Sequence, residues 1–300
     1  MWIVRHRQYG GLQQRKGADR VEYVSAGRDP LRREGAARPL LQVGIAPHSL
    51  RAVQVDELAA LLVARPVGPV HLHAAERTEE VAEVEAGLGA RPVAWLLANT
   101  DLGERWCVIH ATHLTDAEAR GLARSGAVAG LCPLTEANLG DGRFELAAYR
   151  QRGGRFGIGT DANHLIDLPG ELRILEYGQR LASQRRETLL ATGETSVGSV
   201  LFGAARAGGA QALAQPIGAV RPGLRCDLVE LDPEHPALLG QAPATVLDAW
   251  IFSSASDMLV RTVLIGGRIV VAEANHPREA EPRRAVGAIM RRLHGVRESG

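Results

Sequence analysis

Short apolar runs alternate with amphipathic stretches along the first two thirds of the chain. A strand that is buried on both faces is a continuous apolar run, whereas a helix that covers a sheet repeats its apolar residues every three or four positions. These patterns predict strands near residues 1–6, 40–46, 68–74, 105–110, 127–132 and 155–160, with helices near residues 53–64, 79–88, 115–125, 170–186 and 195–214. The alternation is typical of repeated βα units, and we predict a barrel of parallel strands.

The pattern changes near residue 219, where antiparallel strands are expected. Gly266 and Gly267 separate two apolar runs and predict the tight turn of a hairpin. The expected strands are residues 227–232, 260–265 and 268–271, and a basic amphipathic helix is expected at residues 279–296. We therefore predict three parts, at residues 1–218, 219–275 and 276–300. Residues 12–38, rich in Gln, Arg and Gly, break the βα rhythm and are expected to form a loop at the barrel mouth.

Composition and charge narrow the classes of partner. Of the 300 residues, 45% are hydrophobic and 23% are charged, and the formal net charge is +1. A chain this close to neutral has no electrostatic reason to bind nucleic acid or an anionic membrane. With no apolar run long enough to cross a bilayer and no secretory pattern at the start, we expect a cytoplasmic protein. Three widely spaced cysteines, Cys107, Cys132 and Cys226, fit buried free thiols rather than a disulfide framework.

Three apolar runs end in residues that bind metals or transfer protons. His73 closes the first run and is followed by Glu76, His110 closes the second, and Asp161 follows the third. The carboxyl ends of barrel strands meet at one edge, where catalytic groups gather. Imidazole and carboxylate groups are common metal ligands and proton carriers, so this set predicts a hydrolytic metal site. The alternatives are a buried structural histidine and, for the aspartate, a helix N-cap, a role for which Asn163 competes.

Two further histidines compete with the chosen pair. His71 and His73 point to the same face of a strand, as a bidentate metal pair would. His71 lies one layer deeper, however, and is interpreted as structural. His113 follows His110 in the next loop, and His110 is favoured for the site because it is nearer the strand.

A polar group follows the predicted strand that ends near residue 46. Arg51 can hold a carboxylate by two hydrogen bonds, while His48 and Ser49 can donate further ones. The competing interpretation is an arginine that is only solvated at a helix start. The polar, glycine-rich residues 136–142 are expected to form a turn, with a place in the pocket as the alternative.

Seven phrases of the chain are HSLRAV (48–53), VHLHAAE (70–76), RWCVIHATH (105–113), ARSGAVAGLCPLTEANLGDG (123–142), GRFGIGTDAN (154–163), ELRILEYGQRL (171–181) and AGGAQALAQPIG (207–218). Together they resemble the amidohydrolase superfamily, and within it the formimidoylglutamate deiminases, from about residue 40 onward. The resemblance implies an α/β fold, a metal-dependent hydrolase (β/α)8-type barrel with part of a small β-sandwich at the C-terminus.

The resemblance also implies roles for the residues at the strand ends. His73 and Asp161 would be ligands of one divalent metal ion, with zinc as the first choice. His110 would orient or polarise the reacting group, and Glu76 would carry protons to the leaving nitrogen. The implied reaction is the hydrolytic deimination of N-formimidoyl-L-glutamate to N-formyl-L-glutamate and ammonia, a step of histidine degradation. His48, Ser49 and Arg51 would hold the glutamate part of this small-molecule substrate.

Two further metal ligands are expected in the superfamily, as an H-x-H pair on the first barrel strand. His6 is the only histidine before His48, and it has no partner two positions away. We therefore expect an N-terminally incomplete barrel, equivalent to the C-terminal two thirds of the family's protein, that binds zinc poorly and is inactive by itself. The alternatives are another amidohydrolase that deaminates an aminated heterocycle, and a non-catalytic barrel remnant. A homodimer is one option for its assembly.

Overall fold

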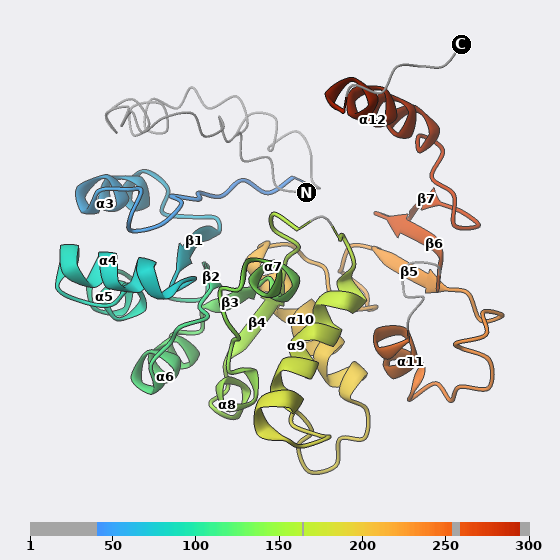
Figure 1. The fold of residues 1–300 in the computed structure, drawn as a ribbon, viewed down its shortest axis with the longest axis horizontal. Helices are drawn as coiled ribbons and strands as arrows, with labels where there is room; N and C mark the ends of the chain where they lie inside the picture. Colours follow the sequence, from blue (N-terminus) through green and yellow to red (C-terminus); the bar gives the residue numbers. More distant parts are fainter. Residues whose placement is uncertain (1–40, 164, 254–258, 295–300) are drawn as a thin grey trace.

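The computed structural model describes residues 41–163, 165–253 and 259–294, and Figure 1 shows their arrangement. A parallel sheet of four strands, in the order β1-β2-β3-β4, lies at its centre. The strands are β1 (Val70–Ala74), β2 (Trp106–His110), β3 (Val128–Leu131) and β4 (Arg155–Ile158). Four predicted strands are thus confirmed. The strand predicted at residues 1–6 and the loop predicted at residues 12–38 lie outside the described residues.

The register brings the carboxyl ends of these strands to one edge. β1 pairs with β2 so that Ala74 lies opposite His110, and β3 pairs with β4 so that Leu131 lies opposite Ile158. Both faces of the sheet are covered, because Leu72 and Val108 are fully buried on one face and Val128 on the other. Continuous apolar runs are what such doubly covered strands require.

The prediction of a strand at residues 40–46 is wrong, because the described residues 41–46 form no regular strand. Ile45 makes a parallel bridge with Val70, and Ser49 makes one with His73, so this segment runs beside β1 without forming a named strand. Pro47 lies between the two bridges and has no N–H to donate to a ladder, which explains the interruption.

Helices follow each strand of the sheet. The predicted helices are confirmed as α3 (Val55–Ala64), α4 (Thr78–Leu88), α6 (Asp116–Ser125), α9 (Leu168–Ser183) and α10 (Val197–Ala212). Sequence analysis missed the helices α5 (Pro92–Asn99), α7 (Pro133–Leu139) and α8 (Leu146–Gln151), which are too short to show a helical period. α10 packs against β4 and β3, and α9 also contacts β4. None of the described helices is long and apolar enough to cross a membrane.

The second sheet is antiparallel and lies beyond α9 and α10 in Figure 1. Its strands are β5 (Leu228–Leu231), β6 (Val260–Ile265) and β7 (Arg268–Val271). Gly266 and Gly267 join the last two strands with positive φ angles of 57° and 77°, which confirms the predicted hairpin. α11 (Val246–Phe252) packs on α10, whereas α12 (Ala280–Leu293) buries no residue.

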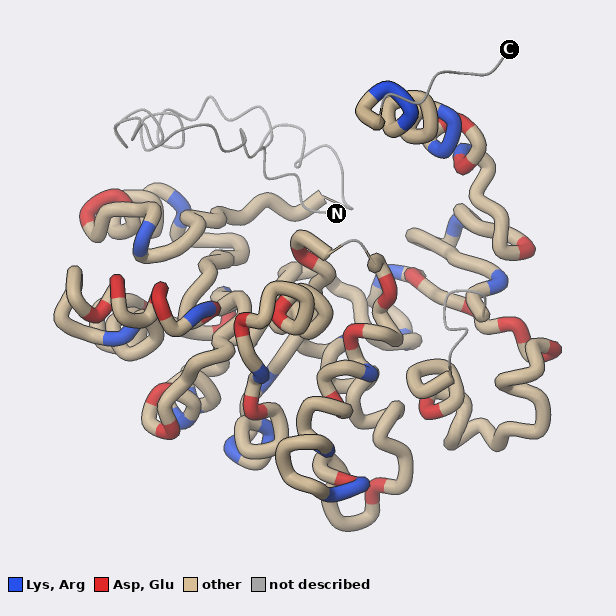
Figure 2. The backbone as a smooth tube through the Cα atoms, viewed as in Figure 1, with Lys and Arg blue, Asp and Glu red and all other residues tan. Residues whose placement is uncertain are grey.

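Acidic and basic residues are mixed along the described elements in Figure 2, in keeping with the net charge of +1. Cys107 and Cys132 are buried free thiols, as predicted. Cys226 is exposed, which corrects the prediction, because the segment before β5 lies at the surface rather than in the core.

Candidate active site

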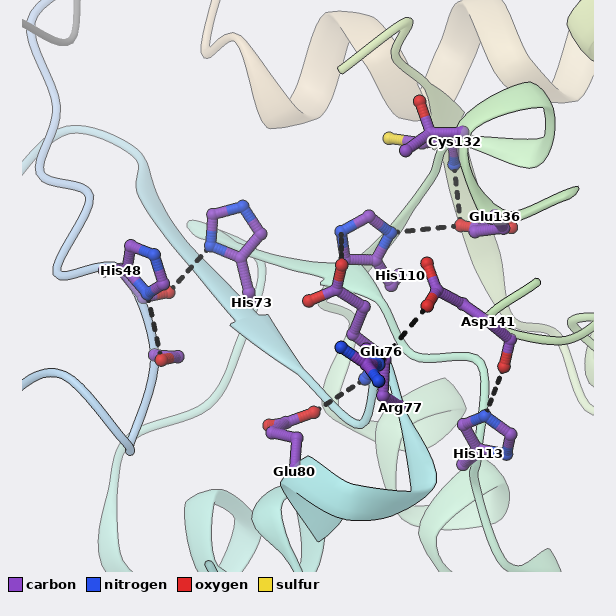
Figure 3. A network of polar contacts seen from close by, with 12 residues as sticks. His48, His73, Glu76, Arg77, Glu80, His110, His113, Cys132, Glu136 and Asp141 are labelled. Carbon is purple, nitrogen blue, oxygen red and sulfur yellow. Dashed lines mark hydrogen bonds and ion pairs between the residues drawn. The ribbon is translucent and has the colours of Figure 1, made fainter. Parts of the chain in front are cut away.

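The two predicted site histidines meet at the carboxyl edge of the parallel sheet. His73 is the penultimate residue of β1 and His110 is the last residue of β2. Their rings stack with centroids 5.6 Å apart and planes inclined by 28°. The His48 ring lies 5.0 Å from that of His73, so three imidazoles form a row (Figure 3). The sheet register, which no local pattern encodes, brings them together.

Site residues adopt backbone conformations that side chains other than glycine rarely adopt. The residues with positive φ at this edge are His48 (63°), Ala75 (57°), His110 (68°), Ala111 (51°) and Asp161 (45°). Each such residue costs about 1 kcal/mol or more, which the surrounding structure must offset. Clustering of this strain at the ends of β1, β2 and β4 is typical of a functional edge.

Asp161 is exposed three residues beyond β4, and its charge raises the tendency of His73 and His110 to bind a proton. The structure contradicts the competing interpretation of Asp161 as a helix N-cap. The next helix, α9, has Asp167 at its N-cap, while the Asn163 side chain bonds within its own loop to Leu165. Asp161 is therefore a carboxylate near two imidazoles.

His73 has the protonation pattern of a metal ligand. Its Nδ1 lies 2.9 Å from the backbone carbonyl oxygen of His48 and must donate to it. Burial is the main reason that the pKa of His73 is lowered, so the neutral ring is favoured. Nε2 then carries the lone pair, and a carbonyl behind the ring is the usual support of a ligating histidine.

The His71 side chain forms a hydrogen bond away from the histidine row, in line with its interpretation as structural. It is buried, and its Nε2 lies 2.9 Å from the carbonyl oxygen of Ala212 at the end of α10. Burial lowers the pKa of His71, so the ring stays neutral as a donor to that carbonyl.

His110 lies between two carboxylates. Its Nε2 is 3.6 Å from Oε1 of Glu76, and its Nδ1 is 3.2 Å from Oε1 of Glu136 (Figure 3). Burial disfavours the imidazolium, but the hydrogen bond to Glu136 and the nearby carboxylates outweigh it and raise the pKa of His110. The site thus pairs a neutral ring at His73 with a more basic one at His110.

Glu136 corrects the prediction of a turn at residues 136–142. It lies in α7 and is buried with 3% exposure. A helix-start signal was visible in the sequence, because Pro133 is followed three residues later by this glutamate. Its contact with His110 could not be foreseen, since it joins two different βα units.

Glu80 is a second residue of the candidate site that sequence analysis missed. Its Oε2 accepts the backbone N–H of Glu76 at 2.7 Å, and it is 1% exposed. Burial raises the pKa of Glu80, while the Arg51 charge nearby opposes the rise. Glu80 supports the turn at Ala75, where the chain leaves β1 with positive φ to present Glu76.

The predicted substrate-binding residues His48, Ser49 and Arg51 lie together, but the Arg51 side chain contacts helix α4. The buried Ser49 hydroxyl is 2.9 Å from Nδ1 of His48. Arg51 is exposed, and its guanidinium pairs with the exposed carboxylate of Glu83 in α4 at 3.4 Å. The structure therefore brings His48 to His73, whereas it gives Arg51 a contact on α4.

His113, the alternative to His110, is held away from the histidine row. Its Nε2 donates to the backbone carbonyl of Asp141 at 2.6 Å, and the Asp141 carboxylate pairs with Arg77 at 3.6 Å (Figure 3). His113 lines a cavity of about 410 Å³ beside α4 whose lining does not include His73 or His110. The preference for His110 rests on its contacts rather than on that cavity.

His73 and Asp161 fit as part of a metal site. A neutral imidazole with a free Nε2 and an exposed carboxylate are donors that divalent transition metals take. Within the described ranges there is no group of three or more His, Cys, Asp or Glu residues that could hold a metal ion. His73 and Asp161 are therefore candidate ligands only of a site that takes further donors.

The parallel sheet and the cluster of residues at its strand ends are those of a barrel hydrolase. Comparison with known sequences identifies the family. The model of the amidohydrolase family matches residues 13–270, and the chain belongs to this family. Formimidoylglutamate deiminase from Pseudomonas aeruginosa is 41% identical over 97% of this chain, and the chain spans 65% of that relative's length. A 5-methylthioadenosine/S-adenosylhomocysteine deaminase from Natronomonas pharaonis is 28% identical over 80% of this chain and 54% of its own length.

Solved structures agree with the family assignment. The crystal structure of an amidohydrolase from Brucella melitensis matches with a TM-score of 0.82 and 42% identity, over 92% of this chain and 60% of that chain. An adenosine deaminase from Xanthomonas campestris with bound zinc matches with a TM-score of 0.77 and 24% identity, over 92% of this chain and 61% of its own. These matches confirm the predicted amidohydrolase fold of the barrel type.

Proposed function

We propose that this chain carries the acid–base groups and part of the metal site of an enzyme that hydrolyses N-formimidoyl-L-glutamate to N-formyl-L-glutamate and ammonia. The observation that carries the proposal is His110, buried between Glu76 and Glu136 and stacked on His73 at the sheet edge. The 41% identity to the Pseudomonas deiminase supports this substrate and a place in histidine degradation.

His73 and Asp161 would hold one divalent metal ion. Zinc is proposed because a related adenosine deaminase of the same fold contains it. The bound metal would supply Lewis acidity that makes water a nucleophile at neutral pH. His73 would offer Nε2, because its Nδ1–H is bonded to the carbonyl of His48.

The remaining residues divide the proton transfers among them. Water adds its oxygen to the amidine carbon, and the bond from that carbon to the terminal nitrogen breaks. Asp161 accepts the first proton from the water, and His110 holds the reacting group through Nε2. Glu76, beside His110, delivers a proton to the leaving nitrogen, which departs as ammonia. The hydroxyl on the carbon loses its remaining proton as the carbonyl forms, so that both protons of the water end on the nitrogen released as ammonia, and the product is an N-formyl amino acid.

Arg51, with His48 and Ser49, would hold a carboxylate of the glutamate part. The Arg51–Glu83 pair is exposed on both sides. Exposed pairs contribute about 0–1 kcal/mol, so a substrate carboxylate with two hydrogen bonds can replace Glu83.

A chimera tests the proposal and separates it from deamination of a heterocycle. Residues 41–275 of this chain replace the matching segment of the Pseudomonas relative. The zinc-loaded chimera is expected to release ammonia from formimidoylglutamate and not from 5′-methylthioadenosine. Ammonia from the nucleoside alone, or from neither substrate in a folded and zinc-loaded chimera, would overturn the proposal. The second result would favour a non-catalytic barrel remnant.

A further inference from the structure

A single oxygen of Glu136 joins α7 to the end of β2. Its Oε1 accepts the backbone N–H of Cys132 at 2.9 Å and lies 3.2 Å from Nδ1 of His110. The bond to Cys132 is a local cap of α7. The bond to His110 reaches a side chain of another βα unit, and a cap does not require it. Both side chains are buried, with exposures of 3% and 1%, so water cannot replace either partner.

The contact decides which ring nitrogen of His110 carries the proton. A carboxylate only accepts hydrogen bonds, and only Glu136 lies within hydrogen-bond distance of the ring, at 3.2 Å against 3.6 Å for Glu76, so Nδ1 is the N–H donor of the neutral ring. In the neutral ring, Nε2 then has the lone pair, and Nε2 is the nitrogen on the side of Glu76, 3.6 Å from its Oε1. The two carboxylates therefore lie at opposite nitrogens of one ring, as Figure 3 shows.

The helix that carries Glu136 is anchored at two points. Glu171 of α9 accepts the backbone N–H of Leu134 at 2.7 Å. The Thr135 hydroxyl donates to the carbonyl oxygen of Thr160, the residue before Asp161, at 3.0 Å. α7 thus contacts His110 through Glu136 and the segment after β4 through Thr135. A carboxylate on an anchored helix can fix a ring that itself has a strained backbone, with φ of 68°.

We propose that Glu136 is a positioning residue for His110, holding the ring in the Nδ1–H tautomer so that Nε2 faces Glu76 and the reacting group. The part of this inference that concerns catalysis rests on the proposed function. The part that concerns the tautomer does not, because it follows from the contacts of the chain itself.

Long-range ¹H–¹⁵N NMR spectra of histidine-labelled chain test the tautomer without substrate or metal. The His110 signals are assigned by their loss in His110→Gln, and the pH is raised until they stop moving. We expect a protonated Nδ1 and an unprotonated Nε2. The opposite pattern in the unsubstituted chain overturns the proposal, whatever the variants do.

Two variants of Glu136 and one control refine the test. Glu136→Gln keeps an acceptor oxygen and should keep the Nδ1–H tautomer, whereas Glu136→Leu should shift the ring toward Nε2–H. Glu176, a buried glutamate of α9 bonded to Arg180, is the control, and Glu176→Gln should leave the His110 signals unchanged. Unchanged His110 signals in a folded Glu136→Leu chain would contradict the proposal.

In the active chimera, Glu136→Leu should lower kcat about 10- to 100-fold with little change in KM, and Glu136→Gln should recover most of the loss. A full kcat for Glu136→Leu overturns the positioning role even if the chimera hydrolyses formimidoylglutamate. An inactive parent chimera would instead count against the proposed function and leave the NMR result to decide the tautomer.

Discussion

Gly208 of α10 packs so closely on the carbonyl oxygen of Phe156 in β4 that a methyl group at Gly208 would overlap it. Helix backbone and strand backbone are in direct contact there. Since β4 leads to Asp161, this contact also helps to fix where the candidate metal ligand leaves the sheet.

Gly208→Ala is therefore expected to push α10 away from β4 and to lower the free energy of unfolding by about 3 kcal/mol or more. Gly209 is the matched control, because a methyl group there meets no atom within 4 Å. Gly209→Ala should raise stability by about 0.5–1 kcal/mol through helix propensity. Denaturant unfolding of both variants measures the difference, and equal effects would refute the packing argument.

Glu171 predicts a pH dependence of stability. It is fully buried in α9, and burial, helped by the charges of Glu136 and Asp167, raises the pKa of Glu171 to about 7. Its folded pKa is above the ordinary 4.5, so its contribution is complete below pH 4.5 and is lost as the pH rises through 7. Ionisation of Glu171 should lower the free energy of unfolding by about 2–3 kcal/mol by roughly pH 8.

Glu171→Gln keeps an acceptor for the Leu134 N–H and removes the charge, so it should be more stable than the parent at alkaline pH and equal to it in acid. Denaturant titrations across this pH range give the measurement. The exposed Glu187→Gln serves as control and should leave the pH profile unchanged. A parent profile that Glu171→Gln does not flatten would show that the carboxyl group is ionised when folded.

Zinc binding by the 300-residue chain is expected to be weak, because residues 41–163, 165–253 and 259–294 hold no group of three or more potential ligands, whereas a closed site needs four. Residual binding should disappear in His73→Ala and persist in His71→Ala. The latter should instead cost about 1–3 kcal/mol of stability by removing the partner of the Ala212 carbonyl. Zinc titration calorimetry and thermal unfolding give the two readouts. Near-stoichiometric zinc with steady ammonia release by the chain alone would contradict this expectation.

Arg51→Ala in the chimera should raise KM for formimidoylglutamate about tenfold or more, since a bond to a charged carboxylate is lost. Glu83→Ala is its control, because it removes the present partner of Arg51 and leaves the guanidinium available. That variant should show an unchanged or lower KM in steady-state assays. An unchanged KM in Arg51→Ala would exclude Arg51 from the site.

Local patterns predicted the elements well where they were long or strongly apolar. β1, β2, β3 and β4 were placed to within two residues, and α6, whose first turn is closed by a capping box of Thr115 and Glu118, lies within the predicted range 115–125. α7 was missed because its seven residues are too few to show a helical period. The interrupted segment at residues 40–46 was mistaken for a strand because its apolar content outweighed Pro47 in the pattern.

The sequence by itself determined the βα order of the chain and which of its residues can ligate a metal or carry a proton, since both follow from apolar runs and side-chain chemistry. Only the tertiary structure decided which of these residues act together. Glu136 and His110 are 26 residues apart, and Glu80 supports Glu76 through a backbone N–H. Strand register sets such distances, and burial then changes the protonation of each group, so neither can be read from neighbouring letters.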